Sequence, residues 1–182
     1  MTSTIGVVGG MGNEAMADLA ANLDDFDGSA DHSYVFYGNS RQAFTPAEAD
    51  DEWEEGDVPL LRKRHTGEFT AALLEALGAG RVGLACNDAH PLYRDIFADR
   101  DAEFVDMIAE TARVPDGDDG VLVLGTKRTL QKRIYDDDLE AAGIETFQPT
   151  PENRSRLMDV IYDPEFGIKT GEVTERAEGL LC

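Results

Sequence analysis

The residues Leu84-Ala85-Cys86-Asn87-Asp88-Ala89-His90 join an apolar run to a polar turn. The run begins at Val82 and the turn continues into Pro91, a pattern typical of a buried strand that ends at a crevice. In open parallel sheets the ligand site lies beyond the carboxyl ends of the strands. Cys86 is therefore the first candidate nucleophile or base. The alternative interpretation is a small buried hydrophobe, for which cysteine is a common choice.

Composition bears on the class of partner. The chain has 182 residues, enough for one α/β core or two small lobes. Its 37 acidic and 16 basic residues give a formal net charge of -21. So negative a surface repels phosphate backbones and anionic lipid, so nucleic acid and membranes are unfavourable partners. An excess of acid with few lysines is typical of a halophilic protein, kept soluble in a salt-rich cytoplasm.

The sequence also lacks the patterns of a membrane span, a signal region and a metal site. No stretch approaches the roughly 18 apolar residues of a membrane span, and the first residues lack a basic and then hydrophobic signal region. We therefore expect a cytoplasmic protein. The two cysteines, Cys86 and Cys182, make no disulfide framework, and no cysteine and histidine cluster has zinc-site spacing. We expect no structural metal.

The first strand is predicted at Thr4 to Val8 and the first helix at Asn13 to Leu23, with the glycine turn 9–12 between them. Glycines at such a turn let the backbone approach a ligand closely, and the first N–H groups of a helix bind anions. The turn therefore predicts a site for a phosphate, a pyrophosphate or a carboxylate.

Residues 10–15 also match the relaxed dinucleotide pattern G-x-G-x-x-A. In that interpretation the next strand, 33–37, ends in an acid that binds the ribose. It ends instead in Gly38-Asn39-Ser40. The missing acid argues against a nicotinamide-dependent enzyme, which remains a minor alternative.

The rest of the chain alternates helices and strands. An acidic segment, 42–56, reads as a surface excursion or a mobile lid. The acidic turn 115–120 has loop composition and predicts a boundary between a lobe at 1–114, which carries Cys86, and a lobe at 115–182. Further strands are predicted at 82–85, 103–106, 121–124 and 144–147, and further helices at 66–77, 92–98, 107–113, from Thr126 to Ala142, 151–162 and 172–181. This order predicts an α/β fold built from two successive β-α-β halves.

Five segments in the same order resemble the aspartate/glutamate racemase family of cofactor-independent amino-acid racemases. They span nearly the whole chain: Ile5-Gly-Val-Val-Gly-Gly-Met-Gly-Asn-Glu-Ala15, Ala85-Cys-Asn-Asp-Ala-His90, Met107-Ile-Ala-Glu-Thr-Ala112, Leu124-Gly-Thr126 with Thr129, and Asp159-Val-Ile-Tyr-Asp163 with Ile168-Lys-Thr-Gly171. The resemblance implies two pseudo-symmetric lobes with parallel, flavodoxin-like sheets, an active site between them, no cofactor, and usually a homodimer. It also implies that Cys86 occupies the position of one of the family's two catalytic cysteines.

Two thiols suit racemisation, because inverting an α-carbon takes a proton from one face and returns one to the other. Fixed N–H and hydroxyl donors must then stabilise the charge that spreads onto the substrate carboxylate. By resemblance the donors come from the glycine turn, Asn87 and Thr126, while Lys169 pairs with a side-chain carboxylate. The full predicted substrate-binding set is Gly10, Met11, Gly12, Asn39, Asn87, Asp88, Thr126 and Lys169.

Three departures from the family pattern matter. Asp88 stands where the family commonly has threonine, and an acid beside the thiol opposes thiolate formation. The family's Pro-Asp-Arg segment, whose arginine helps to hold a substrate carboxylate, has no match between Asn39 and Gly56. Arg41 is the basic residue available in that part of the sequence. The family's second catalytic cysteine lies in a Gly-Cys-Thr-Glu strand after the last helix, whereas this sequence ends within that helix at Cys182. The sequence therefore predicts a shortened chain, with the second lobe incomplete at its C-terminus and activity impaired.

Three hypotheses follow. The first is an amino-acid racemase of this family with Cys86 as the base on one face. The second is a degenerate, non-catalytic relative that binds a small carboxylate. The third is a different enzyme on the same fold, such as a one-thiol lyase or isomerase acting at a carbon next to a carboxylate.

Overall fold

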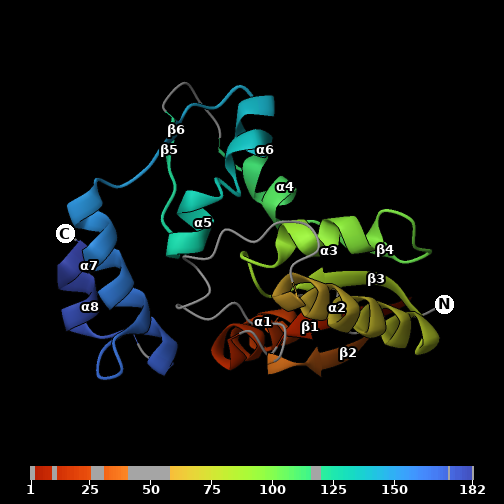
Figure 1. Cartoon of the computed structure of the whole chain (residues 1–182). Helices are drawn as coiled ribbons and strands as arrows, with labels where there is room; N and C mark the ends of the chain where they lie inside the picture. Colours follow the sequence, from red (N-terminus) through yellow and green to blue (C-terminus); the bar gives the residue numbers. More distant parts are fainter. Residues whose placement is uncertain are drawn as a thin grey trace. The chain divides into compact units, whose positions relative to one another are not determined.

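The computed structural model describes residues 3–9, 12–25, 31–40, 58–115, 120–171 and 173–181. It divides into two compact units, Met1–Met107 and Ile108–Cys182 (Figure 1). The division falls within helix α4 (Met107–Ala112), whereas the sequence-based interpretation places it after residue 114. Several predictions lie outside the described residues: the segment 42–56 and the roles of Gly10, Met11, Arg41 and Cys182.

The first unit contains one parallel sheet. Its strands are β1 (Ser3–Gly9), β2 (His32–Gly38), β3 (Ala79–Leu84) and β4 (Glu103–Val105), in the order β2-β1-β3-β4. Strand β1 pairs with β2 on one side and with β3 on the other, so it lies at the centre of the sheet. The β-branched run Thr4 to Val8 predicted β1, and the short runs 33–37, 82–85 and 103–106 predicted the other three strands to within a few residues. The predicted α/β class with parallel sheets is confirmed.

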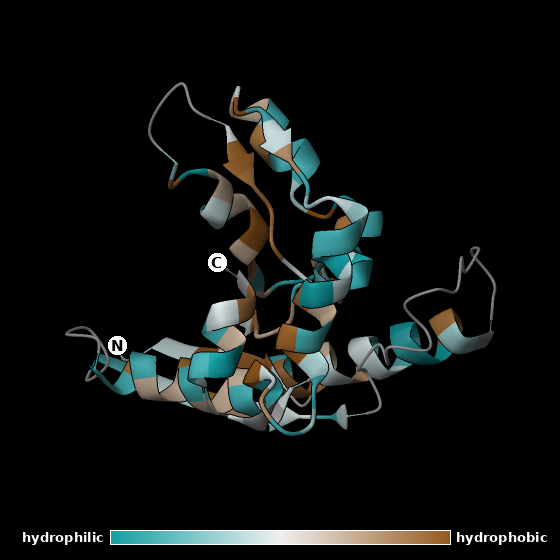
Figure 2. Cartoon of the chain, turned by 90° about the vertical axis from the view of Figure 1, so that its left-hand side faces the viewer, coloured by the Kyte–Doolittle hydropathy of each residue, from teal (hydrophilic) through white to brown (hydrophobic). Residues whose placement is uncertain are grey.

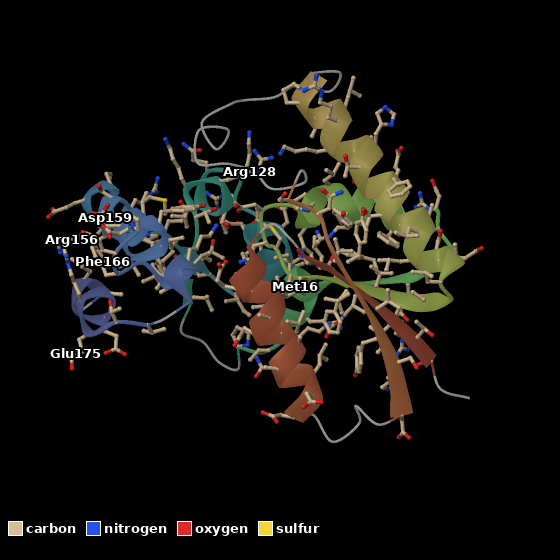
Figure 3. All side chains as sticks on the ribbon, turned by 90° about the horizontal axis from the view of Figure 1, so that it is seen from below. Met16, Arg128, Arg156, Asp159, Phe166 and Glu175 are labelled. Carbon is tan, nitrogen blue, oxygen red and sulfur yellow. The ribbon has the colours of Figure 1, made fainter. Side chains whose placement is uncertain are left out.

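Helix α1 (Asn13–Asp25) follows β1 in the chain, and it packs closely against the last residue of that strand, Gly9. A Cβ atom at Gly9 would overlap the side chain of Met16, which Figure 3 labels on α1. The absence of a side chain at Gly9 therefore lets α1 begin immediately beyond the end of the central strand.

Helices α2 (Val58–Ala76) and α3 (His90–Phe97) complete the core of this unit. The apolar spacing of Phe69, Leu73, Leu74 and Leu77 predicts one buried face of this helix. Leu74 is buried and Leu73 is half-buried, as expected, whereas Phe69 and Leu77 are 60% and 53% exposed, which corrects the other half of that prediction. Ala71 and Leu74 are fully buried, and a Cβ atom at Gly67 would overlap the side chain of Ile96 on α3.

The second unit has a two-stranded parallel sheet formed by β5 (Val121–Leu122) and β6 (Thr146–Phe147). Its helices are α5 (Lys127–Gln131), α6 (Asp136–Ala141), α7 (Pro151–Tyr162) and α8 (Glu175–Leu181), with a 3-10 turn η4 (Ile168–Thr170) before α8. The main core cluster joins α4, the segment after β5, and helices α5, α6 and α7 through buried side chains: Ala112, Val123, Leu130, Leu139, Leu157 and Ile161. Helix α8 packs on α7 in a separate cluster that contains Val160, Phe166 and Ala177.

Two predictions for this unit were wrong. The helix expected to continue to Ala142 is interrupted between α5 and α6, because Arg133 adopts a left-handed conformation with φ 49°. Arg133 pairs there with the buried Asp136, the first residue of α6, at 2.6 Å. An ion pair to a buried carboxylate offsets the backbone strain of a non-glycine residue in this region.

The four apolar residues 121–124 predict a buried strand, but the strand is paired over only two residues. Leu122 and Leu124 are 54% and 53% exposed, and Phe147 on β6 is 48% exposed. Within the described residues β6 is the partner of β5, and only the face that carries Val123 packs on the core. Figure 2 shows β5 and the segment after it in the hydrophobic colour.

Among the described helices none is long and apolar enough to cross a membrane.

Candidate active site

Cys86 lies just beyond the carboxyl end of β3. The N–H of Ala85 donates to the carbonyl of Val8 at 2.9 Å, which extends the pairing with β1 by one residue past the strand. On the other side of β1, the N–H of Asn39 donates to the carbonyl of Gly9 at 3.1 Å. Asn39 and Cys86 therefore follow two strands that flank the same central strand, at the sheet edge where ligands bind in such folds.

The Cys86 side chain is half-buried. It packs against the main core cluster of the first unit, which includes Val8, Leu84 and Ala89. This packing agrees with the hydrophobic interpretation, although the residue as a whole is only half-buried. A cysteine that packs on the core and is still partly exposed is suitable for proton transfer.

His90 fixes the peptide group of Cys86. Its imidazole is fully buried, with Nδ1 3.1 Å from the carbonyl oxygen of Cys86 and Nε2 3.0 Å from the backbone nitrogen of Met107. Because the Met107 N–H can only donate, Nε2 must accept, and Nδ1–H then donates to Cys86; this tautomer is assigned from the partners. Both ring nitrogens are engaged, so His90 holds the site in place and is no general base.

The environment of His90 favours its neutral form. Burial lowers the pKa of His90 below the ordinary value of 6.5, and the nearby Arg94 guanidinium acts in the same direction. The hydrogen bond to the Cys86 carbonyl and the Asp106 carboxylate, 3.7 Å from Nε2, oppose this effect. Since burial is the largest of these influences, the ring is neutral at pH 7 and keeps one donor and one acceptor.

Other predicted residues of the first unit that the structure describes follow the strands of the same sheet. Asn87 and Asp88 are half-buried in the turn after Cys86, and the Asn87 carbonyl accepts from the His90 N–H at 3.0 Å. Gly12 precedes α1, and its carbonyl accepts from the Met16 N–H at 3.4 Å. Three β-strand ends thus contribute to one edge: Gly12, Asn39 and the turn that carries Cys86.

Thr126 and Lys169 belong to the second unit. Thr126 caps α5, where its Oγ1 accepts from the Thr129 N–H at 3.2 Å. Lys169 is exposed in η4, and its Nζ lies 4.5 Å from the centre of the Tyr162 ring. This cation–π contact orients the ammonium group. Within the described ranges no three His, Cys, Asp or Glu side chains form a candidate metal site.

Sequence reasoning did not assign His90 a role. The available signal was its spacing, because His90 follows Cys86 by one helical turn at the beginning of α3. Its second partner, Met107, begins α4 and lies far along the sequence. Local spacing cannot reveal that second contact.

Comparison with solved structures identifies the fold. The Picrophilus torridus aspartate racemase matches 98% of this chain and 73% of its own length, with 25% identity and a TM-score of 0.72. A proposed Asp/Glu racemase from Yersinia pestis matches 99% of the chain and 77% of its own, with 20% identity and a TM-score of 0.74. The chain has the aspartate/glutamate racemase fold. The resemblance predicted from the sequence is thus confirmed.

A third structure extends this racemase-fold comparison. An aspartate racemase homologue from Pyrococcus horikoshii OT3 matches 88% of the chain and 70% of its own length, with 23% identity and a TM-score of 0.67. No family model matches the sequence. At these identities the racemase fold is retained while most residues differ, so the role of each site residue has to be argued from its own surroundings.

Proposed function

We propose that this chain is a cofactor-independent amino-acid racemase related to the aspartate/glutamate racemases, in which the Cys86 thiolate removes the substrate α-proton. The observation that carries the proposal is the position of Cys86. It is a half-buried cysteine two residues beyond the end of β3, a strand that flanks the central strand of a racemase-like sheet. The similarity to the Picrophilus torridus aspartate racemase supports the choice of reaction.

The chemistry requires a base, a carboxylate site and a second acid. The thiolate takes the α-proton, and the electron pair of the broken C–H bond spreads onto the substrate carboxylate. Donors at the sheet edge, in our proposal the Asn39 and Asn87 amides and the backbone of the glycine turn, stabilise that charge. An acid on the opposite face of the α-carbon then returns a proton and inverts the centre.

His90 supports this step through the backbone. Its Nδ1–H holds the Cys86 carbonyl and its Nε2 holds the Met107 N–H, so the peptide that carries the thiol is tied to two elements of the unit. A base that is fixed before the substrate arrives loses less entropy in the transition state. We also propose that Thr126 and Lys169 bind substrate carboxylates and that the protein acts as a cytoplasmic homodimer.

The test is isotope exchange by the purified protein at high salt with a panel of L-amino acids in deuterated water. A racemase gives D-product that carries α-deuterium. Cys86→Ser should lower that exchange by at least about a hundredfold, because serine is a far weaker base and general-base steps contribute about 10²–10⁴-fold. Cys182→Ser, the matched control at the other cysteine, should retain activity. Full exchange in Cys86→Ser would remove the thiol from the mechanism.

The half-buried Asp88 favours a second candidate function, that of a non-catalytic relative that binds a small carboxylate. A carboxylate two residues after Cys86 opposes formation of the thiolate. The same experiment separates the candidates. A one-thiol lyase or isomerase exchanges the α-proton without inversion, whereas a binding protein gives neither exchange nor D-product while the substrate carboxylate still shifts its melting temperature.

A further inference from the structure

The second unit contains a cavity between α5 and α7. Its volume is about 220 Å³. Each helix contributes side chains spaced so that they lie on one face, three or four residues apart. The lining residues are Lys127, Leu130 and Gln131 from α5, and Arg154, Ser155 and Met158 from α7.

Arg154 is held in place by a relay of hydrogen bonds. Its Nη2 donates to Oε1 of Gln148 at 3.0 Å, and its Nε donates to the Pro149 carbonyl at 2.9 Å. Gln148 is itself fixed, because its Nε2 donates to the Leu130 carbonyl at 2.9 Å. The relay therefore connects α5 to α7 through the guanidinium group.

This arrangement leaves donors for a ligand. A guanidinium group has five N–H donors, and the two bonds to Gln148 and Pro149 use two of them. An arginine whose position is fixed before binding recognises an anion with little further loss of rotamer entropy. The remaining donors of Arg154 are thus available to a group in the cavity that it lines.

The lining is cationic in a strongly acidic protein. Lys127 and Arg154 supply two positive charges, and none of the six lining residues is acidic. The whole chain has 37 acidic residues against 16 basic ones, so a pocket with two basic and no acidic side chains departs from its average surface. Leu130 and Met158 add apolar surface beside these charges, while Ser155 and Gln131 add neutral hydrogen-bonding groups.

We propose that this cavity is a binding site for a small organic anion: a carboxylate or phosphate group held by Arg154 and Lys127, with a short apolar part against Leu130 and Met158. The cavity is smaller than the about 300–1,000 Å³ typical of sites for drug-sized ligands, so the ligand has few heavy atoms. All six lining residues belong to the second unit, so the site is separate from Cys86 and does not depend on racemase activity.

The experiment measures binding to the full chain carrying Cys86→Ser, so that its outcome is independent of catalysis. Butyrate, inorganic phosphate and the uncharged butyramide are titrated at constant chloride concentration and followed by amide chemical shifts. Arg154→Gln and Lys127→Gln remove one charge each. The matched control is Arg156→Gln, since Arg156 lies on the same helix (Figure 3), pairs with Glu152 at 3.0 Å and does not line the cavity.

Butyrate or phosphate should shift amides of α5 and α7, and Arg156→Gln should bind it as tightly as the parent. Arg154→Gln and Lys127→Gln should each weaken binding by about tenfold, the usual effect of one charged hydrogen bond. The exposed Lys127 keeps the test valid if Arg154→Gln fails to fold. Equal affinity for butyramide, equal binding by all variants, or no shift with either anion would overturn the proposal.

Discussion

At the scale of single residues, His90 links the chemistry of the site to stability. Its buried ring donates to Cys86 and accepts from Met107, and protonation would place a second N–H against the Met107 donor. A charged His90 therefore costs both a hydrogen bond and the burial of a charge. The charged groups that face the ring are the Asp106 carboxylate and, on its own helix, Arg94.

This geometry predicts a pH dependence of stability. The pKa of His90 is lower in the folded chain than its ordinary value of 6.5, so between these two values the unfolded chain binds more protons. The stabilisation is present above pH 6.5 and is lost as the pH falls toward the folded pKa. Urea unfolding at pH 7.5, 6.5 and 5.5 should show the parent losing more free energy than His90→Gln.

The comparison with His90→Gln isolates this residue from the many carboxylates, which titrate equally in both proteins. Glutamine has no titrating group, and its side-chain amide can still form a hydrogen bond. An identical pH slope in the parent and in His90→Gln would show that the imidazole remains uncoupled from folding. The exposed His65, which lies 3.4 Å from Glu68, provides a second control as His65→Gln.

At the scale of elements, two leucines of the α2 region differ in how much they contribute to the core. Leu74 is fully buried, whereas Leu77, the first residue after the same helix, is 53% exposed. Leu74→Ala should lower the free energy of unfolding by about 2–5 kcal/mol, because it leaves a cavity in the core. Leu77→Ala should change it by no more than about 0.5 kcal/mol. Chemical denaturation of both variants measures the difference, and comparable losses would contradict the packing of α2 described above.

The same elements show what the sequence could predict. The strands of the first unit were predictable because each contains a short run with β-branched or aromatic residues, which favour strands. The buried face of α2 was predictable only in part, because Phe69 is as apolar as the buried Leu74 and is nevertheless 60% exposed, while α3 approaches α2 closely at Gly67. Likewise, the break in the helix at Arg133 was not predictable. It depends on the ion pair between Arg133 and the buried Asp136, and helix propensities do not take such an ion pair into account.

The candidate site divides in the same way. The position of Cys86 just beyond a strand was predictable, because an apolar run that passes into polar residues is typical of a strand that ends at the ligand-binding edge of a parallel sheet. Its role as a base stays a prediction. The pair of hydrogen bonds formed by His90 was not predictable, since its Nε2 accepts from the N–H of Met107, which begins another element. The anion-binding cavity was hidden for the same reason, because Lys127 and Arg154 come together only when α5 and α7 pack.

At the scale of the whole molecule, the net charge of -21 opposes folding through repulsion among carboxylates. Exposed pairs such as Arg81–Glu103, at 2.9 Å, act in the opposite direction but contribute only about 0–1 kcal/mol each. Added salt weakens both effects, since the Debye length falls from about 10 Å at 0.1 M to about 3 Å at 1 M. With many more acids than bases the repulsion dominates, so screening should stabilise the protein.

We therefore expect the melting temperature to rise between 0.1 and 1 M KCl by more than about 2–4 °C, the shift that 1 kcal/mol produces in a domain of about this size. Screening saturates once the Debye length is shorter than the spacing between charges, whereas exclusion of a salt from the surface continues to strengthen with concentration. Thermal unfolding in KCl and in potassium sulfate separates the two effects. A flat or falling melting temperature in KCl would show that the favourable pairs outweigh the repulsion of the excess carboxylates.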